Sequence, residues 1–244
     1  TFFLNGEYIP APDAKVSVDD RGYLFADGVY EVVRVYDGRA FRMDAHLDRL
    51  AHGLDDLQIE LPSIDELDDV VEKLLDENGL RSGDAKVYMQ VTRGCAPRAH
   101  AFPKDCEPAV YIAASTLKPH PAKYFDEGVG AITVTDTRWA RCDIKSISLL
   151  PNVLANQRAH AAGAFEALFV RDGIVLEGSH SNLWAVYDET LVTYPACNYI
   201  LSGITRDEVF DIAEAEGIAA GEGLIPEERL MDADELFLSG TTTV

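Results

Sequence analysis

The sequence predicts an α+β protein with two domains, and three observations support this. Runs of β-branched and aromatic residues bounded by turn residues indicate short strands, and other segments carry apolar residues at helical spacing. The stretch Lys118-Pro119-His120-Pro121 interrupts both patterns, because its prolines resist helix and β-ladder alike. We therefore expect a small mixed N-terminal domain over residues 1–117, a linker over residues 118–123 and a larger, strand-rich domain over residues 124–244.

The strands of the first domain are predicted to pair mainly antiparallel. Asn5-Gly6 is a strong turn signal and should join two short strands within residues 2–9. A second turn, Asp37-Gly38, should join another pair of strands. Besides the first hairpin, strands are expected at residues 28–35, 40–42, 85–92 and 109–116.

Two helices are predicted between these strands. Residues 44–58 carry four leucines at the spacing of one helix face. The second helix should follow Pro62, with Ser63 as its N-cap and Glu66 completing a capping box. Asn78-Gly79 should end it, since glycine is favoured just past a helix C-terminus.

The second domain alternates short strands with two helices. Its helices are expected near residues 151–163 and 205–217, and Arg171-Asp172-Gly173 is typical of a hairpin turn. Its strands are expected at residues 129–135, 167–170, 183–187, 191–193 and 235–239. The sequence contains no internal repeat or low-complexity tract.

The composition argues against several classes of partner. A net charge of −21, from 42 acidic and 21 basic residues, repels nucleic acid and anionic membrane surfaces. No apolar run approaches the roughly 20 residues that span a bilayer, and residues 1–18 lack the basic and apolar regions of a signal peptide. A cytoplasmic enzyme is the simplest interpretation.

The cysteines do not form a recognisable metal or disulfide framework. Cys95, Cys106, Cys142 and Cys197 are irregularly spaced, without a CxxC pair. We expect reduced thiols in a reducing compartment and no metal site. Cys142 lies near the chemically most informative segment, where a packed thiol is expected over a reactive one.

That segment contains Lys145, the last lysine of the chain, shortly after an apolar, β-branched strand. Glu177 lies at the end of another predicted strand, before the small-residue turn Gly178-Ser179-His180-Ser181. A lone amine and a carboxylate at strand ends are the two poles of a pyridoxal phosphate site. The amine forms a Schiff base, and the acid keeps the pyridine nitrogen protonated so that the ring acts as an electron sink.

Such a cofactor also needs a place for its phosphate. Ser202-Gly203-Ile204-Thr205 precedes a predicted helix, whose first amides present N–H groups to an anion. The plainer interpretation is an ordinary N-cap. Gly240-Thr241-Thr242-Thr243 follows another strand and offers hydroxyls, and Arg49 on the first long helix could add charge.

A loop at residues 92–103 concentrates cations in this acidic protein. Arg98 and His100 are two residues apart, so on extended chain they would point to one side and clamp a carboxylate. The alternative is a solvent-exposed loop whose arginines balance nearby acids.

The segment Arg21-Gly22-Tyr23-Leu24-Phe25-Ala26-Asp27-Gly28-Val29-Tyr30-Glu31-Val32-Val33-Arg34 is too specific for an ordinary strand entry. Together with the loop at residues 92–103, the lysine segment at residues 142–152, the turn at residues 177–182 and Gly203-Ile204-Thr205-Arg206, it resembles the class IV (fold-type IV) aminotransferases. These matches are collinear over essentially the whole chain. The Arg-x-His loop is most similar to the D-amino-acid aminotransferase branch.

The resemblance implies a role for each matched position. Lys145 corresponds to the Schiff-base lysine, which also moves the proton between the substrate Cα and the cofactor C4′, and Glu177 to the pyridine-nitrogen partner. Leu201 corresponds to a residue packed beneath the ring, or else to plain core. The phosphate contacts correspond to Arg49, Ile204, Thr205 and Thr241. Arg138 and Tyr30 resemble residues near the cofactor phenolate and the substrate, and the substrate carboxylate trap corresponds to Tyr30, Arg98 and His100.

The activity implied is ping-pong transamination through pyridoxamine phosphate. A D-amino acid such as D-alanine or D-glutamate donates its nitrogen, and a 2-oxo acid accepts it. In this family the neighbouring subunit contributes the Arg-x-His loop, so the resemblance implies a homodimer. The alternatives are a branched-chain L-amino-acid aminotransferase and a 4-amino-4-deoxychorismate lyase.

The chain departs from the family pattern in two places. His180 stands where relatives have a small or hydroxyl residue, which would alter hydrogen bonding beside the pyridine ring. Relatives also continue past the position of Val244 with a segment ending in a helix, so we expect the sequence to be incomplete at that end.

Overall fold

In the computed structural model, which describes residues 1–243, the chain divides into two compact units. Unit 1 comprises Thr1–Pro119 together with Ile144–Ser148, and unit 2 comprises His120–Asp143 and Leu149–Val244. Helices and strands both contribute to each unit, which confirms the predicted α+β class. The predicted domain limits at residues 117 and 123 stay a prediction.

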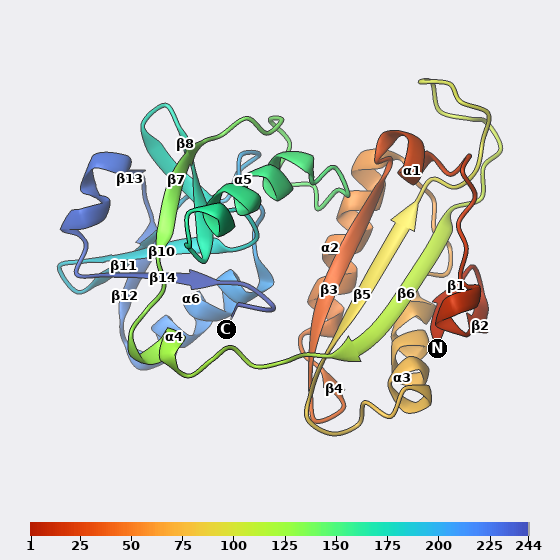
Figure 1. Cartoon of the computed structure of the whole chain (residues 1–244), viewed down its shortest axis with the longest axis horizontal. Helices are drawn as coiled ribbons and strands as arrows, with labels where there is room; N and C mark the ends of the chain where they lie inside the picture. Colours follow the sequence, from red (N-terminus) through yellow and green to blue (C-terminus); the bar gives the residue numbers. More distant parts are fainter. Residues whose placement is uncertain (244) are drawn as a thin grey trace. The chain divides into compact units, whose positions relative to one another are not determined.

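Unit 1 is a six-stranded antiparallel sheet with two long helices (Figure 1). The strand order is β2-β1-β6-β5-β3-β4, and all neighbouring strands pair antiparallel. Its strands are β1 (Phe2–Leu4), β2 (Glu7–Ile9), β3 (Gly28–Tyr36), β4 (Arg39–Ala40), β5 (Asp84–Thr92) and β6 (Ala109–Thr116). Its helices are η1 (Ala11–Asp13), α1 (Arg21–Phe25), α2 (Met43–Leu57), η2 (Ile64–Glu66) and α3 (Leu67–Glu77).

The core of unit 1 lies between one face of the sheet and helices α2 and α3. The register aligns Glu31 of β3 with Met89 of β5 and Ile112 of β6, so these three side chains share the face that the helices cover. Val33 and Leu74, both without exposed surface, pack into the same core. The opposite face carries Tyr30 and its half-buried neighbours.

The predicted capping box at the second helix is wrong. The Ser63 side chain makes no capping hydrogen bond, because its backbone (φ −95°, ψ 19°) lies outside the extended region that N-cap residues adopt. The chain instead begins with the 3-10 turn η2, and α3 follows at Leu67. Helix α1, which Asp20 caps through its side chain, was not predicted.

Unit 2 contains two four-stranded sheets (Figure 1). One has the order β12-β11-β10-β14 and the other β13-β9-β8-β7; two of the pairings, β7 with β8 and β11 with β12, are parallel. The strands are β7 (Ala131–Thr135), β8 (Glu166–Arg171), β9 (Ile174–Gly178), β10 (Asn182–Tyr187), β11 (Thr190–Thr193), β12 (Ala219–Glu222), β13 (Ile225–Pro226) and β14 (Glu235–Ser239). The helices are α4 (Lys123–Asp126), α5 (Leu150–Ala161), α6 (Ile204–Glu216) and η3 (Glu227–Asp232).

Two apolar clusters stabilise unit 2. One cluster contains residues from strands of both sheets, among them Leu168, Leu183 and Ile225. Ala159 of α5 packs on Phe169 of β8 in the other cluster. The predicted turn at residues 171–173 is confirmed, since Asp172 and Gly173 both have positive φ between β8 and β9.

Within residues 1–243, none of the helices is both long enough and apolar enough to cross a bilayer.

We expect Leu74→Ala to lower the free energy of unfolding by about 2–5 kcal/mol, because it empties a fully buried position in the unit 1 core. Chemical denaturation measures the change. Val18→Ala, at a side chain 70% exposed, is the matched control and should change it by less than about 0.5 kcal/mol. Equal losses in the two variants would contradict the packing described here.

Candidate functional site

Lys145 lies in the short segment Ile144–Ser148, which adds to the edge of β3 in unit 1. The Tyr30 amide donates to the Lys145 carbonyl at 3.0 Å, and the Ile147 amide donates to the Gly28 carbonyl at 3.1 Å. The Lys145 Nζ lies 4.3 Å from the centroid of the Tyr30 ring. Strand pairing therefore brings two predicted site residues, Lys145 and Tyr30, together.

Arg49, predicted to contact a phosphate, is oriented by the buried carboxylate of Glu31. Its Nε donates to Glu31 Oε1 at 2.7 Å and its Nη2 to Oε2 at 2.8 Å. His46 Nδ1 lies 2.7 Å from the same Oε2. Burial alone would raise the pKa of Glu31, but the bonds from Arg49 and His46 lower it to about 2. Burial lowers the pKa of His46, so the cluster holds one ionised acid and one arginine.

Arg98 and His100 belong to the loop between β5 and β6, and both lie beside Phe25 of α1. The Arg98 guanidinium carbon is 5.1 Å from the Phe25 ring centroid, and the His100 ring centroid is 5.6 Å from it. Arg21 donates to the carbonyls of Ala99 (2.6 Å) and His100 (3.4 Å). The loop is thus fixed through its backbone around one aromatic side chain.

The base of this loop is held by Asp27, which binds two arginines. Arg21 Nε donates to Asp27 Oδ2 at 2.7 Å, and Arg93 donates to both oxygens at 2.8 and 3.0 Å. Burial would raise the pKa of Asp27, but the bonds with Arg93 and Arg21 lower it below its ordinary value. Arg93 also stacks on Phe102, with its guanidinium carbon 3.6 Å from the ring centroid.

Glu177, at the end of β9 in unit 2, is buried with both carboxylate oxygens bonded. Arg138 Nη1 donates to Oε1, and Asn182 Nδ2 donates to Oε2 at 3.2 Å. The Leu201 amide also donates to Oε2 at 3.2 Å. Leu201, predicted to pack beneath a cofactor ring, therefore contributes its backbone to the position of Glu177.

Arg138 is itself fixed on three sides. Asp136 accepts from its Nε at 3.0 Å, the Tyr199 carbonyl accepts from Nη2 at 3.2 Å, and the Phe169 ring lies 4.0 Å from its guanidinium carbon. Burial would lower the pKa of Arg138, but Glu177 and Asp136 raise it, so the side chain is permanently charged. Arg138 and Glu177 form one rigid ion pair.

The N-terminus of α6 has the features of an anion site. Gly203 is its N-cap and makes no side-chain capping bond, so the first amides, including those of Ile204 and Thr205, are not satisfied by a cap side chain. A Cβ at Gly203 would lie 2.2 Å from Asn182 Oδ1, so only glycine fits there. Asn182 therefore connects Glu177 with this helix start, and the arrangement fits a phosphate bound by backbone N–H groups.

Thr241 lies in the turn after β14, beside the turn at residues 178–182. Strands β14 and β10 pair Ser239 with Asn182, and a Cβ on Gly240 would lie 3.4 Å from the His180 carbonyl. His120 Nε2 lies 2.9 Å from the Thr242 carbonyl. The predicted hydroxyl turn thus adjoins the turn that follows Glu177.

Glu166 organises the turn after Glu177 and explains His180. Its Oε1 accepts from the amide and hydroxyl of Ser179 at 3.0 and 2.6 Å, and its Oε2 accepts from the Ser181 hydroxyl at 2.7 Å. His180 Nδ1 lies 3.0 Å from Oε2. Burial would raise the pKa of Glu166, but His180 and then the serines lower it to about 2. His180 thus faces Glu166, instead of altering the partners of Glu177.

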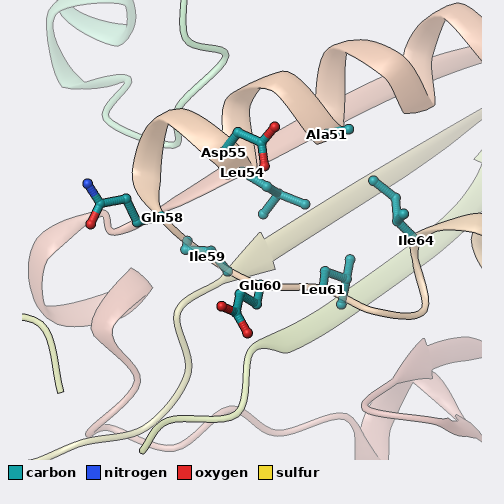
Figure 2. Close-up of a pocket in the computed structure, with 8 residues that line it drawn as sticks. All are labelled: Ala51, Leu54, Asp55, Gln58, Ile59, Glu60, Leu61 and Ile64. Carbon is teal, nitrogen blue, oxygen red and sulfur yellow. The ribbon is translucent and has the colours of Figure 1, made fainter. Parts of the chain in front are cut away.

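A separate cavity of about 320 Å³ lies at the C-terminal end of α2 (Figure 2). It is lined by Ala51, Leu54, Asp55, Gln58, Ile59, Glu60, Leu61 and Ile64. None of these lining residues is basic, and none was predicted for the site. Its acidic and apolar character does not suit a phosphate.

Sequence reasoning missed the buried residues that orient the predicted ones. They are Asp27, Glu31, His46, Asp136, Glu166 and Asn182. Two of them carried a signal: Glu31 and Glu166 are the single acids of largely apolar strands, where an unpaired charge would be costly.

Comparison with known proteins relates this chain to the aminotransferases of class IV. The family model for amino-transferase class IV matches residues 28–244. The chain is 43% identical over 241 residues to a D-alanine aminotransferase of Staphylococcus epidermidis, covering 98% of this chain and 85% of that protein.

Solved structures share the fold over nearly the whole chain. A branched-chain amino acid aminotransferase of Escherichia coli superimposes with a TM-score of 0.91 at 27% identity, covering 99% of this chain and 83% of that one. A hypothetical aminotransferase from Mycobacterium tuberculosis in its PLP-bound form gives a TM-score of 0.86 at 25% identity, covering 100% and 88%.

We expect Glu166→Gln to destabilise the protein by about 3 kcal/mol at neutral pH, because the folded pKa of about 2 lies below the ordinary value of 4.5. A depressed pKa stabilises the fold above pH 4.5, and this contribution is lost as the pH falls from 4.5 towards 2. The variant should therefore lose less stability than the wild type across that window. Chemical denaturation at a series of pH values measures both effects.

Glu235→Gln, at an exposed acid in the same unit, is the control and should leave the pH dependence unchanged. The assignment fails if Glu166→Gln retains the wild-type slope between pH 4.5 and 2.

Proposed function

The chain belongs to the class IV aminotransferases, and we propose that it transfers the amino group of D-amino acids, such as D-alanine and D-glutamate, to a 2-oxo acid. The observation that carries the choice of substrate is the placement of Arg98 and His100 around Phe25, in a loop pinned by buried charges. Its D-alanine aminotransferase relatives support the same choice.

The cofactor is pyridoxal 5′-phosphate, which supplies an electron sink and carries the amino group between donor and acceptor. Several residues of the chain fit it. Lys145 offers a primary amine on a fixed backbone, and Glu177 offers a buried, oriented carboxylate. The uncapped start of α6 at Ile204 and Thr205 offers N–H groups for the phosphate.

Each residue then has a distinct task. Lys145 binds the cofactor and moves the proton at the substrate Cα. Glu177 would keep a proton at the ring nitrogen, and Arg138 holds Glu177 in place and would act near the cofactor phenolate. Leu201 would pack against the ring, and Arg49, Thr205 and Thr241 would also hold the phosphate.

Substrate orientation is assigned to Tyr30, Arg98 and His100. A guanidinium binds a carboxylate through two parallel hydrogen bonds, which fixes the direction as well as the position of the substrate. The side on which the α-carboxylate docks decides which Cα–H is presented to Lys145. These two side chains therefore select the D-enantiomer.

We also propose that the active form is a homodimer in the cytoplasm, each site receiving the Arg98 loop of the other subunit. The support is the family resemblance of the loop at residues 92–103, together with four free cysteines of the kind found in reducing compartments.

A branched-chain L-amino-acid aminotransferase is the second candidate, favoured by the close superposition on the Escherichia coli enzyme. A 4-amino-4-deoxychorismate lyase would use the same lysine. Fold similarity does not separate these activities, because function resides in the site and not in the architecture. The substrate must therefore be tested directly.

We expect purified protein supplied with pyridoxal phosphate to show a visible absorption band that bleaches with D-alanine and not with L-leucine. Lys145→Ala should lack this band, because no amine remains to bind the cofactor, and activity should fall by at least about 10³-fold. Absorption spectroscopy measures both.

Bleaching by L-leucine alone would assign the protein to branched-chain substrates. A band that neither amino acid changes would point to the lyase. A wild type without any band after addition of the cofactor would overturn the cofactor assignment.

We expect Arg98→Ala to lower kcat/KM for D-alanine about 10²-fold or more, since it removes a charge-assisted contact to the carboxylate. The absorption band should remain, because Lys145 is intact. Arg42→Ala, another exposed arginine of unit 1, is the control and should retain activity. Unchanged D-alanine turnover in Arg98→Ala would disprove the carboxylate assignment.

Mixing the two impaired variants, Lys145→Ala and Arg98→Ala, tests the proposed exchange of loops. If the loop acts on the partner's site, a hybrid of Lys145→Ala and Arg98→Ala subunits has one intact site. Random reassociation should then restore about a quarter of wild-type activity. No recovery in a mixture shown to contain hybrids would place the loop in its own subunit's site.

A further inference from the structure

Two cysteines face each other at the base of the loop that carries Arg98 and His100. The β5–β6 register pairs Thr92 with Ala109. Cys95 lies three residues after Thr92, and Cys106 lies three residues before Ala109. Figure 1 shows this loop as the long connection between the two strands. Continuing an antiparallel ladder by three residues on each strand places the two cysteines opposite each other.

Hydrogen bonds confirm that the two sides are close. The Cys106 Sγ donates to the carbonyls of Arg93 at 2.9 Å and of Cys95 at 3.3 Å. A Cβ on Gly94 would lie 1.9 Å from the Glu107 carbonyl oxygen, so the two backbones touch beside the cysteines. Opposed residues of an antiparallel pair have Cβ atoms about 4.5–5.5 Å apart, and a disulfide needs about 3.5–4.5 Å. A small side-chain and backbone adjustment is therefore sufficient.

The backbone on the Cys95 side is anchored independently. Cys95 forms a β-bridge with Asp20, and the Ala96 amide donates to the Asp19 carbonyl at 3.3 Å. Arg93 is fixed by Asp27. The two thiols are therefore held near one another instead of meeting by chance.

The different exposure of the two thiols determines which of them reacts first. Cys95 is exposed to solvent, whereas Cys106 is half-buried. Burial, followed by the neighbouring Cys95, raises the pKa of the Cys106 thiol. Cys95 is accordingly the thiol that meets a reagent first, and Cys106 is the one placed to resolve it.

We propose that Cys95 and Cys106 form a reversible disulfide by exchange with a low-molecular-weight disulfide, and that this bond regulates the substrate loop. First, the Cys95 thiolate attacks one sulfur of the reagent, forming a mixed disulfide and releasing one thiol. The Cys106 thiolate then attacks the Cys95 sulfur and releases the second thiol. The protein dithiol is oxidised, and one disulfide molecule is reduced to two thiols.

The bond would close a ring that contains both Arg98 and His100. Oxidation also removes the S–H group through which Cys106 donates to Arg93 and Cys95. The loop base must then rearrange, which alters the positions of Arg98 and His100. This consequence for substrate rests on the proposed function, whereas formation of the bond does not.

The holoenzyme treated with glutathione disulfide provides the test. Trypsin cleaves after Arg98 and Lys104, so Cys95 and Cys106 fall in different peptides. We expect mass spectrometry to show these two peptides linked, with the link lost on reduction. Cys106→Ser should accumulate glutathione on Cys95, and the control Cys197→Ser should form the link normally.

Mixed disulfides without the internal link in the wild type would overturn the proposal, as would links to Cys142 or Cys197. Cys142 is buried, and burial raises the pKa of its thiol to about 11, so it should remain unmodified.

Enzyme kinetics test the regulatory part. The oxidised enzyme should show a KM for D-alanine raised about threefold or more, with the visible cofactor band unchanged. Cys95→Ser should keep the KM of the reduced enzyme after the same treatment. A confirmed link without a change in KM would overturn the regulatory role, and an enzyme inactive on D-alanine would bear on the proposed function alone.

Discussion

A carboxylate that leaves water must recover hydrogen bonds from the protein, and this requirement fixes the geometry of the candidate site. Four acids with largely buried side chains meet it in four places. Asp27 holds the substrate loop, Glu31 orients Arg49, Glu177 is bound by Arg138, and Glu166 shapes the next turn. In each case the acid and its donors hold each other in position. Loss of either partner would leave an unpaired charge in a region of low dielectric.

These acids explain both the success and the limits of prediction from sequence. Hydrophobic periodicity located β5, β6 and α2 almost to the residue, because one face of each must be buried. The same patterns gave no sign of which acids are paired inside, since pairing depends on residues distant along the chain. Arg49 was placed on its helix correctly, but its bond to Glu31 depends on a strand partner 18 residues away.

Local signals failed where the backbone took another course. Ser63 had the right residue type for an N-cap, but the chain entered the helix through a 3-10 turn. His180 departed from the family pattern, and only the three-dimensional arrangement showed that Glu166 receives it. Glu177 and Gly203 were predicted at a strand end and a helix start, and the structure places them there, whereas Lys145 lies ten residues after β7 in a segment that pairs with β3.

The return of the chain to unit 1 at Ile144–Ser148 affects how the protein is made. A ribosome delivers residues 1–119 first, yet the edge of β3 is completed only when Ser148 has emerged. Until then the Tyr30 amide and the Gly28 carbonyl lack the partners that they have in the finished fold. The nascent first half therefore exposes an open strand edge during synthesis, a state prone to wrong pairing with other chains. Dividing the sequence at one point would therefore separate Ile144–Ser148 from the rest of unit 1 or leave it attached to unit 2.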